Sequence, residues 1–183
     1  MLRLDDEFEL TAFRLSDQMR LVELLQSPEI AANTLRIPYP YTSEDARSWL
    51  QFASQLPEKG LRQLAIRQRG GDIVGAIGLE DSPDVARHRA EIGYWLGRDY
   101  WGRGIMKRAV ERLCRYACDD LGIGKITAHV FSTNHRSAAV LRAVGFRLEA
   151  QLPLHYLKND QYIDADIYSL VSARLAAQRS ATR

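Results

Sequence analysis

The sequence predicts an α/β fold whose central sheet has strands of mixed direction. Short apolar segments bounded by turn residues recur along the chain and are typical of strands, whereas four other segments place apolar residues three and four positions apart, as helices do. The longest helical segment, residues 104–121, separates two strand segments at 89–96 and 125–131. A crossover helix makes these two strands parallel, and short turns elsewhere make their strands antiparallel.

The first third of the chain is expected to hold one strand and two helices. Residues 8–15 alternate weakly, as a strand does, and end at Ser-Asp, residue types that commonly begin a helix, at 16–17. Two prolines keep residues 34–42 extended, and this loop is expected to expose its aromatic side chains. A second helix is then predicted at 43–56.

The remainder is expected to alternate between strands and helices. Gly70-Gly71-Asp72 predicts a hairpin turn, and Gly145 predicts the end of a short helix at 137–144. A closing hairpin is expected to turn at residues 158–160. The strands predicted after the first are 61–67, 73–79, 89–96, 125–131, 146–154 and 162–171.

Size and charge exclude several classes of protein. The 183 residues suit one domain, which we place at residues 1–175, followed by a frayed basic tail at 176–183. A net charge of +2 is far from that of proteins that bind nucleic acid across many phosphates. No apolar run approaches the roughly 20 residues of a membrane span, and the N-terminus lacks a signal-peptide pattern. We therefore expect a cytoplasmic protein that binds neither nucleic acid nor membrane.

The two cysteines do not form a convincing metal site. Cys114 and Cys118 lie four positions apart on one face of the long predicted helix, without a neighbouring His or Cys in the sequence. This arrangement favours a buried thiol pair, so no metal is expected.

A glycine-bearing turn between the strand at 89–96 and the long helix has the properties of a phosphate site. Gly102 and Gly104 allow the backbone to approach a ligand closely, and the first N–H groups of the helix point outward at its positive end. Six basic and two acidic residues lie between Arg98 and Arg115. The alternative is a tight turn followed by a solvated basic face. The turn is neither a Walker loop nor a dinucleotide fingerprint, because the required lysine and third glycine are missing.

Several ordered motifs resemble the GNAT superfamily of N-acetyltransferases. They are Ala90-Glu91-Ile92-Gly93-Tyr94-Trp95-Leu96, Tyr100-Trp101-Gly102-Arg103-Gly104-Ile105-Met106, Asn134-His135-Arg136-Ser137 and Val144-Gly145-Phe146. Residues 38–42, 157–164 and 168–170 are similar, more narrowly, to the ribosomal-protein (RimJ/RimL-like) branch. The resemblance covers nearly the whole chain. It implies a mostly antiparallel central sheet of six to seven strands with about four helices.

The resemblance also implies acetyl-CoA as the acetyl donor. Its pyrophosphate would lie at residues 102–107, and its pantetheine arm along Ile92–Leu96. Two positions depart from the family's phosphate motif, because Trp101 replaces a polar residue and Met106 replaces a small one that keeps the turn open. The residues expected to bind the donor are Ile92, Gly93, Tyr94, Trp95, Leu96, Arg98, Trp101, Gly102, Arg103, Gly104, Ile105, Met106, Lys107, Asn134 and Ser137.

Transfer to an amine needs a proton acceptor, a donor to the developing oxyanion and a proton for the leaving thiolate. Glu91 is expected to be the general base, with a surface salt bridge as the alternative. Asp99 is the second carboxylate, although it also suits a turn. The resemblance gives Asn134 and Ser137 the roles of orienting the pantetheine arm and protonating its sulfur, and a helix N-cap is the alternative. Backbone N–H groups near residues 94–95 are expected to receive the oxyanion, and Tyr156 is a second candidate acid.

The acceptor side is expected to be aromatic. Tyr39, Tyr41, His155 and Tyr156 are the predicted acceptor contacts. His88 and Trp49 are weaker candidates, because a loop histidine is more often solvated and Trp49 suits packing between helix and sheet.

These expectations combine into one leading function and two alternatives. The leading function is acetyl transfer from acetyl-CoA to a primary amine by direct attack, with a protein N-terminus, such as that of a ribosomal protein, as the acceptor. The first alternative is a small-molecule amine, namely a polyamine, an amino-acid derivative or an aminoglycoside. The second is a domain that binds acyl-CoA without catalysis. The resemblance also favours a homodimer.

Overall fold

The computed structural model describes residues 1–55, 63–173 and 175–177. Its eight strands form a sheet in the order β1-β2-β3-β4-β5-β6-β8-β7. The predicted parallel pair is confirmed as β5 with β6, and the sheet is otherwise mostly antiparallel. The strands are β1 (Leu2–Arg3), β2 (Phe8–Thr11), β3 (Gln63–Gln68), β4 (Ile73–Asp81), β5 (Arg89–Leu96), β6 (Lys125–Phe131), β7 (Arg147–Lys158) and β8 (Gln161–Val171).

The helices follow the predicted order. They are α1 (Gln18–Leu25), α2 (Pro28–Ala32), α3 (Ser43–Ser54), α4 (Ile105–Asp119) and α5 (His135–Val144). Strand β1 and helix α2 were not expected from the sequence, since two and five residues are too few to show a period. Parts of three predicted segments, at residues 56, 61–62 and 178–183, lie outside the described residues. None of the described helices is long and apolar enough to cross a membrane.

The chain divides into two compact units, each made of two separate stretches of sequence. Unit 1 comprises residues 1–78 and 94–109, and unit 2 comprises residues 79–93 and 110–183. Strand β5 therefore begins in unit 2 and ends in unit 1.

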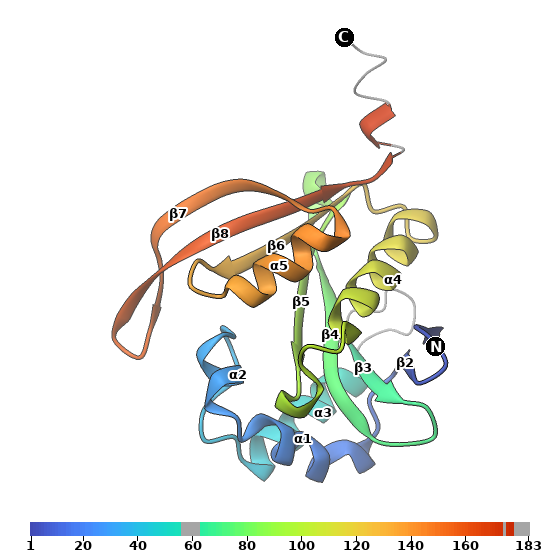
Figure 1. Cartoon of the computed structure of the whole chain (residues 1–183), viewed down its shortest axis with the longest axis vertical. Coiled ribbons are helices and arrows are strands. Elements are labelled where there is room, and N and C mark those ends of the chain that lie inside the picture. The colour runs from blue at the N-terminus through green and yellow to red at the C-terminus, as the bar shows by residue number, and fades with distance from the viewer. Residues whose placement is uncertain (56–62, 174, 178–183) are drawn as a thin grey trace. The chain divides into compact units, whose positions relative to one another are not determined.

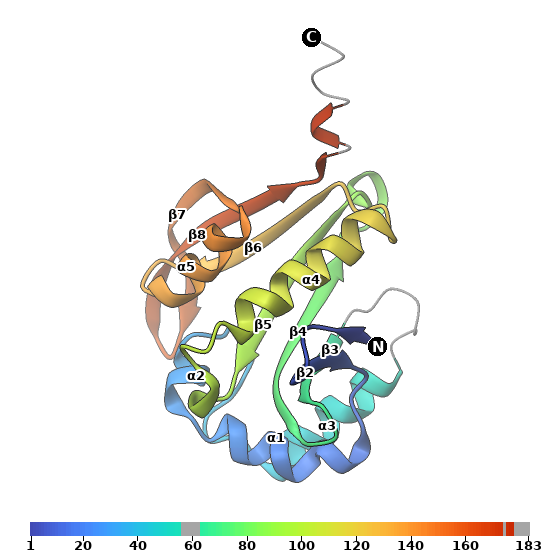
Figure 2. The ribbon, with the colours of Figure 1, turned by 45° about the vertical axis from the view of Figure 1, so that its right-hand side comes forward.

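Unit 1 packs helices α1 and α3 beside the antiparallel strands β1, β2 and β3 (Figure 2). A buried cluster in this unit draws on α1, α2, α3, β3, the first residue of β4 (Ile73–Asp81) and the loop before α3, and it consists of Leu21, Leu24, Leu25, Ile30, Tyr41, Ala46, Leu50, Ala65 and Ile73. Helix α3 begins at a capping box, in which Thr42 accepts from the Asp45 N–H and the Asp45 carboxylate accepts from the Thr42 N–H. The cap fixes where the extended loop ends.

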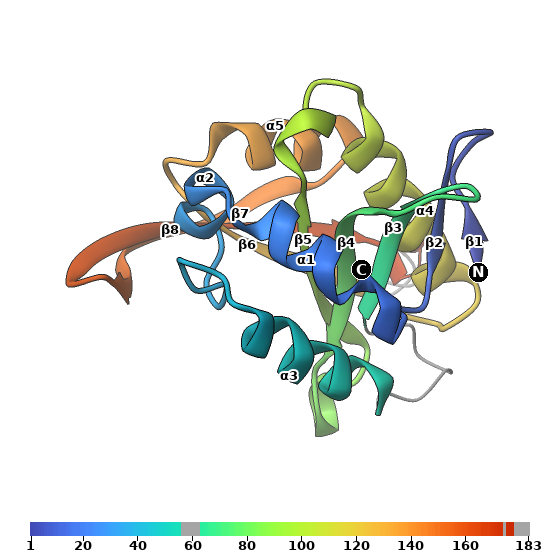
Figure 3. The same ribbon diagram turned by 90° about the horizontal axis from the view of Figure 1, so that it is seen from below.

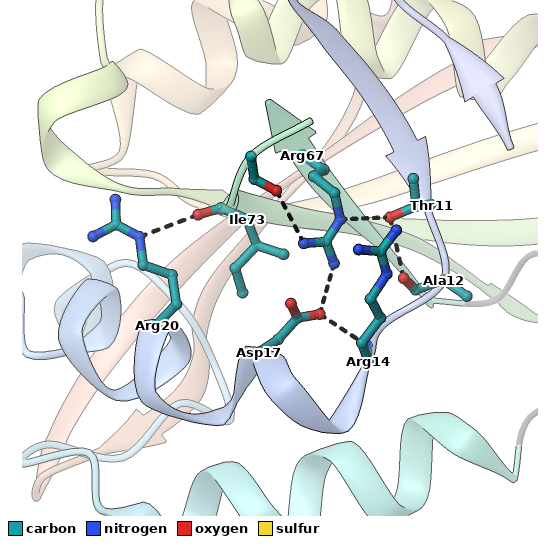
Figure 4. Close-up of polar contacts among 8 residues, drawn as sticks. Thr11, Ala12, Arg14, Asp17, Arg20, Arg67 and Ile73 are labelled. Carbon is teal, nitrogen blue, oxygen red and sulfur yellow. Dashed lines mark hydrogen bonds and ion pairs between the residues drawn. The ribbon is translucent and has the colours of Figure 1, made fainter. Parts of the chain in front are cut away.

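A buried ion pair ties the first helical turn of unit 1 to β3. Arg67 Nη2 lies 2.7 Å from Asp17 Oδ2, and its Nε donates to Thr11 Oγ1 at 3.1 Å (Figure 4). The same Asp17 oxygen accepts from the Arg14 N–H at 2.8 Å. The two buried charges therefore face each other and are hydrogen-bonded to further groups, which makes their burial tolerable.

Unit 2 is dominated by a long hairpin of β7 and β8, drawn orange to red in Figure 1. Strand β6 pairs with β8 from Lys125 opposite Val171 to Phe131 opposite Ala165. Helix α5 lies on one face of these strands (Figure 3) and ends at Gly145, whose φ of 103° only glycine adopts readily. This short helix starts two residues earlier than predicted.

Candidate active site

The glycine turn of unit 1 has an open, left-handed backbone. Gly102 and Gly104 have φ values of 76° and 69°. A Cβ built at Gly102 would meet no atom within 4 Å, and one at Gly104 would meet Arg108 Nη1 at 3.2 Å. Helix α4 starts at the next residue, so its first N–H groups, which have no partner within the helix, follow directly on the turn. This geometry suits an anion at the helix N-terminus.

The arginines of the turn are held by carboxylates of unit 1. Arg98 lies 3.0 Å from Glu29, Arg103 lies 3.5 Å from Glu7 and Arg108 lies 2.7 Å from Asp5. Burial raises the pKa of Asp5, but the N–H groups of Phe8 and Glu7 and the Arg108 guanidinium together hold this pKa below its ordinary value.

Lys107 differs from the neighbouring arginines. It is exposed in the first turn of α4, and the structure gives it no ion pair among the described residues. Lys107 is therefore the cation of this turn that is most available to a ligand.

The two departures from the family's phosphate motif both turn inward. Trp101 Nε1 donates to the carbonyl of Leu96 at 2.7 Å, and the ring packs against the core of unit 1. Arg98 lies over this ring, 4.9 Å from its centroid. Met106 is only 7% exposed, so its side chain is directed into the interior. Trp101 fixes the turn to the end of β5.

Strand β5 leads directly into this turn and alternates between buried and accessible residues. Ile92 and Leu96 are buried, Gly93 is exposed, and Tyr94 and Trp95 are half-buried. Trp95 also packs against the core of unit 1.

In unit 2, Glu91 lies at the start of a short series of titratable side chains. The parallel ladder places Glu91 opposite Thr127, and His129 follows two residues later on the same face of β6. Glu91 Oε2 is 3.9 Å from His129 Nε2, and His129 Nδ1 is 2.9 Å from Tyr156 Oη. The His155 ring stands edge-on to Tyr156, with the centroids 4.6 Å apart. Three of these residues were predicted as site residues, whereas His129 was missed.

A bulge in β7 aims Tyr156 at His129. The pairing of β7 with β8 shifts between Leu152, opposite Ala165, and Tyr156, opposite Ile163. Within the bulge, Leu154 has a φ of 51°, and its N–H donates to Asp164 Oδ1 at 2.7 Å. A bulge changes the direction of the side chains that follow it. The β7 bulge takes the Leu154 N–H out of the ladder, and the Asp164 carboxylate accepts its hydrogen bond instead.

Asn134 acts as the N-cap of α5. Its Oδ1 accepts from the Ser137 N–H at 3.1 Å. This is the helix N-cap that the sequence analysis gave as the alternative for Asn134. The cap uses only the amide oxygen of Asn134, and it holds Asn134 and the half-buried Ser137 together in the first turn of the helix.

Similarity to known proteins shows the family to which the chain belongs. A model of the acetyltransferase (GNAT) domain matches residues 7–147. The chain belongs to the GNAT acetyltransferase family. The uncharacterized N-acetyltransferase p20 of Bacillus licheniformis is 28% identical over 173 residues, covering 93% of this chain and 96% of p20.

Ribosomal-protein acetyltransferases are among the homologues of this GNAT protein. The ribosomal-protein-serine acetyltransferase of Escherichia coli (strain K12) is 25% identical over 130 residues, covering 71% of this chain and 72% of that protein. The solved structure of RimL, a ribosomal L7/L12 alpha-N-protein acetyltransferase in complex with coenzyme A, has a TM-score of 0.82 at 22% identity. That match covers 93% of this chain and 97% of RimL, and it shows a shared fold.

The residues predicted on the acceptor side of this GNAT protein have different surroundings. Tyr39 is 56% exposed, but the expectation of an exposed Tyr41 is wrong, because its ring is buried in the core of unit 1 at 5% exposure. Burial, with the neighbouring Asp45 charge, raises the pKa of Tyr41 to about 12. Trp49 packs edge-on against Phe13 with the ring centroids 6.1 Å apart, which is the packing alternative.

The remaining candidates are peripheral. Asp99 and His88 are exposed, in unit 1 and unit 2 respectively. Cys114 is buried and Cys118 is half-buried, and both are free thiols whose pKa values are raised mainly by burial. Within the part of the chain that the structure describes, no group of three His, Cys, Asp or Glu residues is arranged to hold a metal ion.

Proposed function

We propose that this GNAT protein transfers an acetyl group from acetyl-CoA to a primary amine by direct attack. The observation that carries the proposal lies along one strand. Strand β5 carries Glu91 near its start and leads, at its end, into the left-handed glycine turn that opens α4. The chain thereby links a carboxylate, which accepts protons, to a turn suited to phosphate.

The donor is proposed to bind through the turn and through β5. Acetyl-CoA supplies an acetyl group activated as a thioester. The N–H groups at residues 102–107 and the Lys107 ammonium would hold its pyrophosphate, and Arg98 and Arg103 would contribute once released from Glu29 and Glu7. Ile92–Leu96 would lie along the pantetheine arm, with Asn134 and Ser137 orienting it.

Glu91 is the proposed general base. Its side chain is 40% exposed, so an incoming ammonium group has access to it. Two hydroxyl groups are candidates for the acid that protonates the leaving thiolate, namely Ser137 and Tyr156. Tyr156 is the better supported of the two, because its hydroxyl oxygen lies 2.9 Å from His129 Nδ1, a second titratable group.

The proposed acceptor is the N-terminus of a protein, such as a ribosomal protein. This assignment rests on the similarity to the ribosomal-protein-serine acetyltransferase and on the exposed Tyr39 and His155 as acceptor contacts. A cytoplasmic location and a homodimer complete the proposal. Because both units are assembled from separate stretches of sequence, we also propose that residues 1–175 act as one N-acetyltransferase domain.

Two measurements test the proposal in order. Saturating acetyl-CoA at about 100 times its dissociation constant should stabilise the folded chain by roughly 2.7 kcal/mol and raise the unfolding midpoint by about 5 to 10 °C. Thiol release is then measured with a peptide, the same peptide with a blocked N-terminus, and spermidine. Release with the free peptide alone supports a protein acceptor. Release with spermidine alone overturns the protein acceptor, and binding without any release overturns catalysis in favour of an acyl-CoA-binding domain.

A further inference from the structure

Tyr100 lies two residues before the glycine turn of unit 1 and contacts two arginines, one at its hydroxyl and one at its ring. We infer that Tyr100, fixed by Arg20, is a positioning residue that keeps Arg103 beside the turn for a phosphate of the donor. The inference rests on the proposed binding of acetyl-CoA. It assigns roles to Arg20 and Tyr100, which the proposed function does not use.

Arg20 reaches Tyr100 from helix α1. Its Nη2 donates to the Tyr100 hydroxyl oxygen at 3.2 Å. Its Nε donates to the carbonyl of Ile73, the first residue of β4, at 3.3 Å (Figure 4). The third nitrogen, Nη1, lies 2.6 Å from a carboxylate oxygen of Glu23. The Arg20 side chain is only 22% exposed and all three of its nitrogens have partners, so it offers Tyr100 a fixed and charged donor.

The backbone and the ring of Tyr100 are held as well. Tyr100 ends the short 3₁₀ helix Arg98–Tyr100, and its N–H donates to the Gly97 carbonyl at 3.0 Å. The Gly97 N–H donates in turn to the Val74 carbonyl of β4 at 2.8 Å. The Tyr100 ring packs against the buried cluster of unit 1. Because backbone, ring and hydroxyl each have a separate contact, the orientation of the ring is fixed.

The Tyr100 ring lies beneath the guanidinium of Arg103. Arg103 Cζ is 5.8 Å from the centroid of this ring and 5.6 Å from the centroid of the Phe8 ring. Both distances are within the range of a cation–π interaction, which extends to about 6 Å. The Phe8 side chain is fully buried, so packing fixes it. Two fixed rings therefore limit where the Arg103 guanidinium can lie.

The two rings would keep Arg103 in place when a donor phosphate replaces Glu7. The Glu7 carboxylate is 3.5 Å from Arg103, whose side chain is 45% exposed. An exposed arginine that loses its ion pair gains many rotamers, and binding a phosphate then costs the entropy of ordering it again. A guanidinium over a ring face keeps its N–H groups at the edge available to an anion. The rings would therefore hold Arg103 without competing with the phosphate.

Two variants of Tyr100 separate the role of its ring from that of its hydroxyl. Tyr100→Phe keeps the ring and its packing but loses the bond to Arg20, whereas Tyr100→Leu loses the ring face as well. By calorimetric titration at low salt, we expect Tyr100→Phe to weaken acetyl-CoA binding about threefold and Tyr100→Leu about tenfold. Arg20→Gln should match Tyr100→Phe, and the two together should lose no further affinity, because they remove the same hydrogen bond.

A double-mutant cycle tests whether Tyr100 acts through Arg103. Arg103→Gln should itself weaken acetyl-CoA binding about tenfold, as expected for the loss of one charged phosphate contact. In this background, Tyr100→Phe and Tyr100→Leu should have no further effect. Losses that add would mean that Tyr100 supports the turn independently of Arg103, and the inference is then overturned. Wild-type affinity in Tyr100→Leu or in Arg103→Gln overturns it too.

The loss of a phosphate contact also has signatures that a loss of stability lacks. Added salt should weaken acetyl-CoA binding less steeply in Tyr100→Leu than in the wild-type chain, because one ion pair contributes less. In thiol release, KM for acetyl-CoA should rise while kcat stays within about twofold. With S-acetylpantetheine, a donor without phosphates, kcat/KM should keep its wild-type value. Equal losses with both donors would contradict the inference.

Two variants elsewhere in the chain serve as controls. Arg47 on α3 pairs with Glu44 at a spacing of three residues, as Arg20 pairs with Glu23, and the Tyr116 hydroxyl has no hydrogen bond within the described part of the chain. Arg47→Gln and Tyr116→Phe should bind acetyl-CoA as the wild-type chain does. If the wild-type chain does not bind acetyl-CoA, the proposed donor site fails and the inference with it. Wild-type binding that the Tyr100 variants leave unchanged removes only the inference.

Discussion

Asp17 and Arg67 form an ion pair inside unit 1, with Oδ2 and Nη2 2.7 Å apart and side chains only 6% and 4% exposed. The pair joins the turn before α1 to β3, which are fifty residues apart in sequence. Buried ion pairs of this kind are costly to break, because the remaining charge has no partner and no water.

We expect Asp17→Ala to lower the free energy of unfolding by about 3 to 5 kcal/mol, because the Arg67 guanidinium is left buried and unpaired. Urea unfolding measures the change. The double variant Asp17→Leu with Arg67→Met should recover most of the loss. The exposed pair Glu44 and Arg47 is the control, and Glu44→Ala should cost less than about 1 kcal/mol. Equal losses for the buried and the exposed pair would contradict the assignment.

Gly104 and Gly70 provide a matched test of the proposal that the turn before α4 binds phosphate. Both have φ near 70°, so an alanine at either position is strained by roughly 1 to 2 kcal/mol. At Gly104 the new Cβ would also meet Arg108 Nη1 at 3.2 Å, whereas at Gly70 it would meet nothing. We expect Gly104→Ala to weaken acetyl-CoA binding at least about tenfold, a loss of roughly 1.4 kcal/mol, and Gly70→Ala to leave it unchanged. Calorimetric titration with acetyl-CoA decides, and equal affinities in the two variants would place the phosphates elsewhere.

In the proposed donor site, Glu7 would compete with a phosphate for Arg103. The guanidinium lies 3.5 Å from the Glu7 carboxylate, and both side chains are largely exposed, so their attraction is weak and reversible. Glu7→Gln should therefore tighten acetyl-CoA binding about two- to fivefold, and the gain should shrink as salt is added. Glu9→Gln, two residues further along, removes a charge that forms no ion pair with Arg103 in the structure, and it should have no effect. Weaker binding by Glu7→Gln would mean that Arg103 does not reach the donor.

Local patterns in the sequence were enough to predict most of the fold. The strands at 89–96 and 125–131 and the helix between them have clear periods, and the parallel pairing follows from their order. The short elements β1 and α2 were missed because their stability depends on neighbours in space. Tyr41 was misplaced for a related reason: a loop between prolines predicts exposure, but the capping box at Thr42 turns the chain so that the Tyr41 ring enters the core.

The candidate site was predictable where one segment carries it and unpredictable where strands meet. The glycine turn is continuous in sequence, so its residues stand out together. His129 depends on two pairings, the parallel ladder that faces it toward Glu91 and the β7 bulge that turns Tyr156 toward it. Nothing in the segment Lys125–Phe131 distinguishes this histidine from one that faces solvent. Once the register of the parallel pair is known, one signal does appear: His129 lies two residues after Thr127, which stands opposite Glu91.

Asp5 predicts how unit 1 responds to acid. Burial alone would raise the pKa of its carboxyl, but the Phe8 and Glu7 N–H groups and Arg108 together stabilise the carboxylate more, so this pKa in the folded chain is below the ordinary value. A lowered folded pKa means that Asp5 stabilises the fold above its unfolded pKa of about 3.9, and that this contribution is lost as the pH falls through the folded pKa. Asp5→Asn should therefore be less stable than wild type at about pH 6, and the difference should shrink below about pH 3. Urea unfolding across this range measures it, with Asp6→Asn as the control for losing a surface carboxylate. A difference that stays constant down to the lowest pH would show that the Asp5 charge does not stabilise the turn of α4.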